Sequence, residues 1–147
     1  DGFNTDDLFS KVRISDNAAN NLGGAVFRSA YWGMLLDKNK QTFTWENSKF
    51  ERNRTPLGGG GAAYVNNSLF VLRGVTFDAN DAGAGDGGAL KITGATVQAS
   101  DLTVTNNKAN WGGGIAHWLG GPEGIGSAVR ITYGNNLPQD FVGNFPR

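Results

Sequence analysis

A short sequence phrase recurs four times along this chain at a nearly constant interval. Each copy has an apolar residue, two spacers and an asparagine, followed by a polar stretch and a Gly-Gly pair that opens an apolar run. The apolar residues Phe50, Phe77 and Val104 are each 27 residues apart, and the asparagine precedes the glycine pair by 6 or 7 residues. A period of about 20–50 residues is typical of solenoids, propellers and arrays. The repeat therefore constrains the fold more than any single residue does.

The unit from Gly87 to Gly114 contains three strand-sized pieces, 89–93, 96–100 and 101–105. Apolar and polar residues alternate within them, which is the signal of half-buried strands. After turns are subtracted, about 15–18 residues at about 3.3 Å each remain per unit, enough to pass around a triangular cross-section. We therefore predict an all-β fold, a parallel β-helix (solenoid) of about five rungs with about 27 residues per rung, stacked into three parallel sheets.

Other repeat architectures fit less well. A propeller blade needs four strands in about 40–45 residues, and leucine-rich repeats need a density of leucine that this chain lacks. Glycine supplies 23 of 147 residues and charged residues only 18%, which suits a fold made of many turns. We expect one domain over residues 1–147, a processed piece or repeat segment of a longer secreted protein.

Each recurring letter of the phrase has a physical role in such a coil. The glycine pair permits positive φ and lets one rung sit tightly on the next. The apolar residue fills the interior. Asparagine suits a left-handed corner, and its stacked copies can bond one another. The predicted structural ladder comprises Asn17, Asn53, Asn80, Asn107 and Asn136 with Gly24, Gly61, Gly88 and Gly114.

Two of these elements, Phe-x-x-Asn and Gly-Gly-(Ala/Ile), carry a family resemblance. Phe50-Glu-Arg-Asn53 and Phe77-Asp-Ala-Asn80 match the first letter for letter, and all four glycine pairs match the second. On these motifs, residues 14–140 resemble the repeats of the chlamydial-type polymorphic outer-membrane protein (Pmp) family. The resemblance implies a right-handed parallel β-helix on an extracellular surface, as part of a long adhesin or passenger region.

Two insertions interrupt the rhythm, about ten residues near 30–42 and about three near 118–126. Insertions in solenoids become loops on one face, often the binding face. Tyr31, Trp32 and Trp118 lie in or beside them and are the candidate binding surface. Packing is the expected role of most other aromatic residues.

Few residues are candidates for modification, catalysis or metal binding. Of two glycosylation sequons, Asn66-Asn-Ser68 holds the better acceptor, Asn66, because Asn53 of the other belongs to the ladder. His117 is the only histidine, and with no cysteine in the chain we expect it to have a structural or exposed role. No catalytic residue, metal or cofactor is expected.

An enzymatic reading must be weighed, because polysaccharide lyases share the β-helix. They need several acidic residues with Lys or Arg on one sheet, often around calcium. The one dense cluster here comprises Asp78, Asp81, Asp86 and Asp101 with Lys91. We expect no enzyme, and keep a carbohydrate-binding or lyase-like β-helix as the alternative.

Thirteen basic and thirteen acidic residues cancel, so nothing marks the chain for nucleic acid or an anionic membrane. No apolar stretch approaches the roughly 20 residues of a membrane span. We expect an extracellular or cell-surface structural or adhesive module, which in its sharper version stacks head to tail into a filament because open rungs expose strand edges. Its expected partners are the same chain or adjacent β-helix segments, with host-surface or carbohydrate ligands, and no nucleic acid or direct membrane insertion.

Overall fold

The computed structural model describes residues 7–29, 42–66, 68–118, 125–138 and 141–143, and these residues form strands and turns without a helix. The strands are β1 (Asp7–Ser10), β2 (Arg13–Ser15), β3 (Val26–Ser29), β4 (Thr42–Glu46), β5 (Lys49–Glu51), β6 (Ala63–Asn66), β7 (Leu69–Arg73), β8 (Thr76–Asp78), β9 (Leu90–Thr93), β10 (Thr96–Thr105), β11 (Ile115–Trp118), β12 (Ile125–Gly134) and β13 (Phe141–Gly143).

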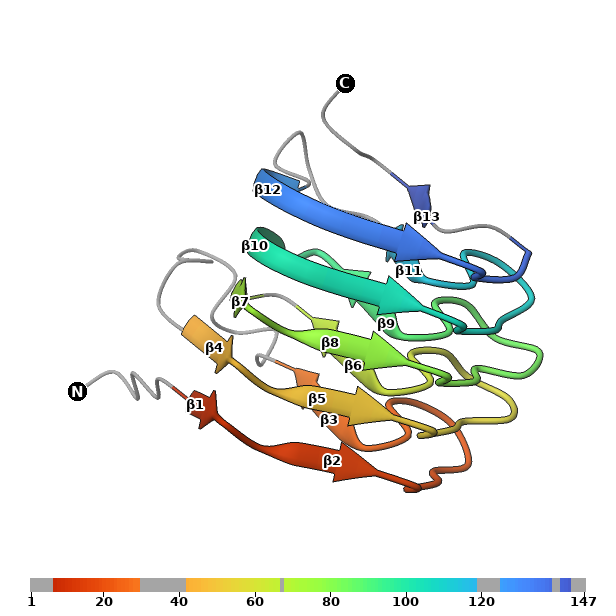
Figure 1. The fold of residues 1–147 in the computed structure, drawn as a ribbon. Helices are drawn as coiled ribbons and strands as arrows, with labels where there is room; N and C mark the ends of the chain where they lie inside the picture. Colours follow the sequence, from red (N-terminus) through yellow and green to blue (C-terminus); the bar gives the residue numbers. More distant parts are fainter. Residues whose placement is uncertain (1–6, 30–41, 67, 119–124, 139–140, 144–147) are drawn as a thin grey trace.

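The strands stack into two parallel sheets. The larger sheet has the order β1-β4-β7-β10-β8-β5-β2, with β12 also paired to β10, and the smaller one has the order β13-β11-β9-β6-β3. In Figure 1 the chain climbs from the first turn to the last as a right-handed coil, the usual hand for crossovers between parallel strands. The predicted all-β parallel solenoid is confirmed.

The register of the central turns confirms the 27-residue period. Thr42 of β4 pairs with Leu69 of β7, and Leu69 pairs with Thr96 of β10. The same row advances 36 residues between β1 and β4, and 29 between β10 and β12 after a register shift at Val97. About three turns therefore keep the 27-residue step, slightly fewer than the predicted five rungs, and longer turns precede and follow them. Most of each predicted insertion lies outside the described residues.

The coil has two sheets instead of the predicted three, because one corner does not interrupt the strand pairing. β10 and β12 each continue for ten residues through that corner. A single residue in the left-handed region turns the chain there, Asp101 with φ 54° and Arg130 with φ 56°. Two rows of strands thus merge into one sheet.

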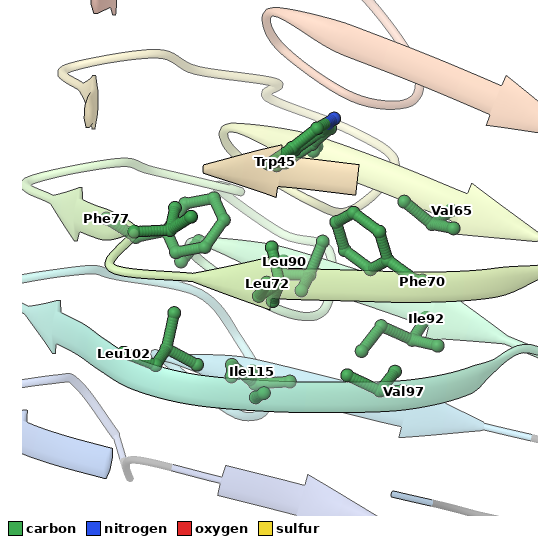
Figure 2. Close-up of a cluster of buried hydrophobic side chains, with 14 of the residues drawn as sticks. Trp45, Val65, Phe70, Leu72, Phe77, Leu90, Ile92, Val97, Leu102 and Ile115 are labelled. Carbon is green, nitrogen blue, oxygen red and sulfur yellow. The ribbon is translucent and has the colours of Figure 1, made fainter. Parts of the chain in front are cut away.

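Aromatic and aliphatic side chains together fill the interior between the two sheets (Figure 2). Phe50 and Phe77 are fully buried, and their ring centroids stack 5.2 Å apart. Trp45 stacks on Phe50 with ring centroids 4.4 Å apart and makes a T-shaped contact with Phe70 at 4.6 Å. Removing one such ring typically costs about 3–5 kcal/mol of stability, so this column anchors the central turns.

Candidate functional site: the asparagine ladder and the loop face

The five predicted ladder asparagines lie in one column along a corner of the coil. In each of the first four, the side-chain Nδ2 donates to the Oδ1 of the asparagine one turn further on, at 2.9–3.1 Å. The backbone N–H donates to the same oxygen at 2.9–3.1 Å. Nδ2 also donates to a backbone carbonyl of the preceding turn, as from Asn80 to Phe50 at 3.0 Å.

Burial makes these bonds obligatory. Asn53 and Asn80 are completely buried, and Asn107 is 1% exposed. A buried amide without partners costs several kcal/mol, whereas here both oxygen and nitrogen are bonded. The column therefore ties each turn to its neighbours through side chains as well as backbone.

The asparagines do not themselves occupy the left-handed corner, contrary to expectation. The residue before each asparagine has the positive φ, between 51° and 60°: Asp16, Arg52, Ala79, Asn106 and Asn135. The asparagine side chain is required for its hydrogen bonds, and the bend is made one residue earlier.

The glycine pairs divide two tasks. Gly87, the first of its pair, has φ 67°. Gly88, the second, lies so close to the next turn that a Cβ would sit 2.0 Å from the carbonyl oxygen of Gly113. Gly24 and Gly61 have the same tight contact. The loop of the fourth turn is shorter, so that Gly113 takes the position of Gly88, and Gly114 stands level with Ala89.

An ion-pair network joins the first two turns. The Glu51 carboxylate, whose side chain is only 3% exposed, pairs with Arg13, with Lys49 at 2.6 Å and with Arg52 at 3.2 Å. Hydrogen bonds from Lys49 and Arg13 lower the pKa of Glu51 to about 2. Arg52 also reaches Asp16 at 2.7 Å and lowers the pKa of that carboxyl. This network stabilises the contact between the first two turns.

The acidic cluster noted in the sequence is dispersed by the fold. Asp78 accepts hydrogen bonds from Thr105 and Asn106. Asp86 pairs with Lys91 at 3.1 Å, and Asp101 pairs with Arg130. No group of three or more His, Asp or Glu residues that could hold a metal occurs in the described part of the chain.

The remaining predicted sites divide between core and surface. His117 is 2% exposed, and its Nε2 lies 3.2 Å from the carbonyl oxygen of Ala95. Trp118, at the end of β11, is 39% exposed. Asn66 is half-buried at the end of β6. Tyr31 and Trp32 lie outside the described residues, so the candidate binding surface stays a prediction.

Sequence reasoning missed a hollow of about 400 Å³ on the loop face, between the loops that follow the first three ladder asparagines. It is lined by Ala18, Ala19, Asn20, Arg54, Pro56, Asp81 and Gly83. Its signal in the sequence is weak: the position directly after each ladder asparagine changes character from turn to turn, and only the fold places those residues side by side.

Comparison with known families gives a match in the fourth turn. There the end of β10, the ladder residue Asn107 and a glycine-rich loop follow one another along the chain. Residues 101–117 match the Chlamydia polymorphic membrane protein repeat. The predicted Pmp-type repeat is thereby confirmed, and the matched segment coincides with the part of one turn from the Asp101 bend to His117. No curated protein and no solved structure matches the chain.

The Pmp-type repeat relates this coil to surface and outer-membrane proteins that contain a β-helix. The part of the chain described here holds no helix of the length and apolarity that crossing a membrane requires.

Proposed function

We propose that this chain is an extracellular structural and adhesive module, a rigid β-helical segment that stacks head to tail with further copies of itself. The observation that carries this proposal is the direction of the asparagine ladder. Asn53, Asn80 and Asn107 each accept two N–H groups from the turn before and donate two to the turn after. The same bonds would join two coils end to end, in one orientation.

The first described turn supports the stacking. Asn17 is exposed, and no described residue donates to its Oδ1. Phe9, Ile14 and Val26 of this turn are only partly buried. The residues paired with them in the second turn are at most 2% exposed. An added turn would bury this apolar surface, which stabilises by about 25 cal/mol per Å². It would also supply N–H donors to Oδ1 of Asn17.

The surface location is supported by the repeat family. A coil with parallel hydrogen bonds in every turn resists bending, which suits a spacer that holds binding regions away from a cell. Labelling of intact source cells with an antibody against the chain tests the location: surface staining supports it, and staining only after permeabilisation contradicts it.

Electron microscopy and sedimentation of the purified chain test the stacking. We expect end-to-end oligomers or filaments that lengthen with concentration. Ile14→Glu, which puts a charge on the open first turn, should reduce the species to monomers. The matched control Leu57→Glu alters a residue that is 70% exposed on a loop, and it should assemble like the wild type. A wild type that stays monomeric throughout would overturn the stacking.

A further inference from the structure

The residues that directly follow the ladder asparagines form an outward column on the loop face. Ala18 pairs with Arg54, Arg54 with Asp81, Asp81 with Lys108, and Lys108 with Leu137. All are exposed except Asp81, which is half-buried. Adjacent parallel strands are about 4.8 Å apart, so two cations flank one carboxylate along the coil axis.

No described carboxylate pairs with Arg54 in this column, although other arginines of the coil have such partners. Arg13, Arg52, Arg73 and Arg130 each pair with a carboxylate. Among the residues that the structure describes, none lies within ion-pairing distance of the Arg54 guanidinium, and Lys108 is equally unpaired. An arginine presents planar donors that match a carboxylate in two parallel hydrogen bonds. Arg54 is therefore open to an external anion.

The hollow beside Arg54 has the size and lining of a small-ligand site. Its volume of about 400 Å³ lies within the usual range of about 300–1,000 Å³. Ala18 and Pro56 supply an apolar wall, while Asn20 and Asp81 supply polar groups. Oδ1 of Asp81 accepts the Gly83 N–H at 2.7 Å, which leaves Oδ2 for a hydroxyl donor.

A cation, a carboxylate and an amide beside an apolar wall match a sugar that carries a carboxyl group. Arg54 would take the carboxylate, Asp81 and Asn20 the hydroxyl groups, and Pro56 the apolar face of the ring. An acidic peptide offers carboxylates but few hydroxyl groups, and Asp81 repels a second carboxylate. The lining therefore favours a uronic acid over a peptide.

We propose that the loop face binds an acidic polysaccharide laid along the coil axis, with one uronate at Arg54 and the next at Lys108. These cations are two turns apart, about 9.6 Å at the parallel-strand spacing, which is comparable to the length of a disaccharide. The site thus suits a polymer with one carboxylate in every disaccharide. It lies on the flank of the coil, so it does not depend on end-to-end stacking.

Calorimetric titration with a hyaluronan octasaccharide, which has one uronate per disaccharide, tests the proposal. We expect binding that weakens with added salt and is lost when the carboxyl groups are reduced to alcohols. Arg54→Gln should weaken binding at least about tenfold, because hydrogen bonds to charged groups are the stronger ones. The matched control Arg73→Gln, an exposed arginine already paired with Glu46, should bind like the wild type.

Asp81→Asn separates sugar recognition from simple charge attraction. The substitution removes a negative charge, so it should strengthen binding to any polyanion held by charge alone. Recognition of hydroxyl groups by Asp81 predicts the opposite, weaker binding to the octasaccharide. Absence of binding by the wild type, unchanged binding by Arg54→Gln, stronger binding by Asp81→Asn, or equal binding of poly-glutamate would each overturn the proposal.

Discussion

Asparagine in the ladder column is chosen for having a donor and an acceptor on one short side chain. The buried Asn80 receives N–H groups on Oδ1 and gives N–H groups from Nδ2. Aspartate would lose the donors, and glutamine would place the amide one methylene too far out. The predicted column follows from the sequence because the spacing of the asparagines matches the period. The left-handed residues that precede the asparagines could not be predicted from the sequence, since Arg52 and Ala79 have no preference for positive φ.

Replacing a buried ladder asparagine should destabilise the fold strongly. Asn80→Ala leaves the N–H of Asn53 and the carbonyl of Phe50 without their partners. Each buried unsatisfied group costs about 1–3 kcal/mol, so we expect a loss of about 3 kcal/mol in the free energy of unfolding in urea. Asn110→Ala, at an exposed loop position, is the control and should change stability little. Equal losses of stability in the two variants would contradict a stabilising role of the ladder.

The glycine that lies against the next turn, which is Gly24, Gly61, Gly88 or Gly113, should tolerate no side chain at all. In Gly88→Ala the Cβ would meet the backbone oxygen of Gly113 at 2.0 Å and the Lys108 nitrogen at 2.6 Å. Backbone cannot yield as a flexible side chain can, so we expect a loss of about 3 kcal/mol or more, measured by thermal and urea unfolding. Gly134→Ala meets only a methyl group of Thr105 at 3.6 Å, and near-native stability is expected there. A stable Gly88→Ala protein would show that the turns are less closely packed.

At the scale of elements, the alternation of apolar and polar residues predicts most strands, but it does not predict how they join. The pieces 96–100 and 101–105 form one strand, β10, because Asp101 turns the chain while pairing continues on both sides. The burial pattern breaks its alternation at this residue. In successive turns the left-handed residue at this corner is Lys11, Asn47, Gly74, Asp101 and Arg130, so no single residue type marks it in the sequence.

Glu51 of β5 pairs with Arg13 of β2, which makes the stability of the fold depend on pH. Its pKa in the folded state, about 2, lies below the ordinary value of 4.5. The ionised carboxylate therefore stabilises the fold fully above about pH 4.5, and this contribution is lost as the pH falls towards 2. Urea unfolding between these pH values should show a steeper decline for the wild type than for Glu51→Gln.

The control for this pH effect is Glu46→Gln, whose carboxylate pairs with the exposed Arg73. It should keep the wild-type dependence on pH, because an exposed pair contributes little. If the stability of Glu51→Gln and of the wild type depends on pH in the same way, Glu51 does not stabilise the contact between the two turns.

For the whole molecule, the period of the repeat predicts the parallel coil, its stacked turns and its aromatic interior. The loop face could not be predicted in the same way. Ala18, Arg54 and Asp81 are far apart in the sequence and differ in character, and they meet only because the turns stack in register. The shorter fourth loop, which moves Gly113 into the place expected for Gly114, likewise depends on strand pairing.

Stacking at one 27-residue step is the central claim, and pairs of introduced cysteines test it directly, because the chain contains no cysteine of its own. Thr76 and Thr103 are partners in register on β8 and β10, so Thr76→Cys with Thr103→Cys should form an intramolecular disulfide under mild oxidation. Thr76→Cys with Thr105→Cys is the control: its Cα atoms would be ~8 Å apart from strand geometry, beyond the reach of a disulfide. Cross-linking of the first pair alone is the predicted result. Cross-linking of both pairs, of neither, or of the second alone would contradict the register and the coil built on it.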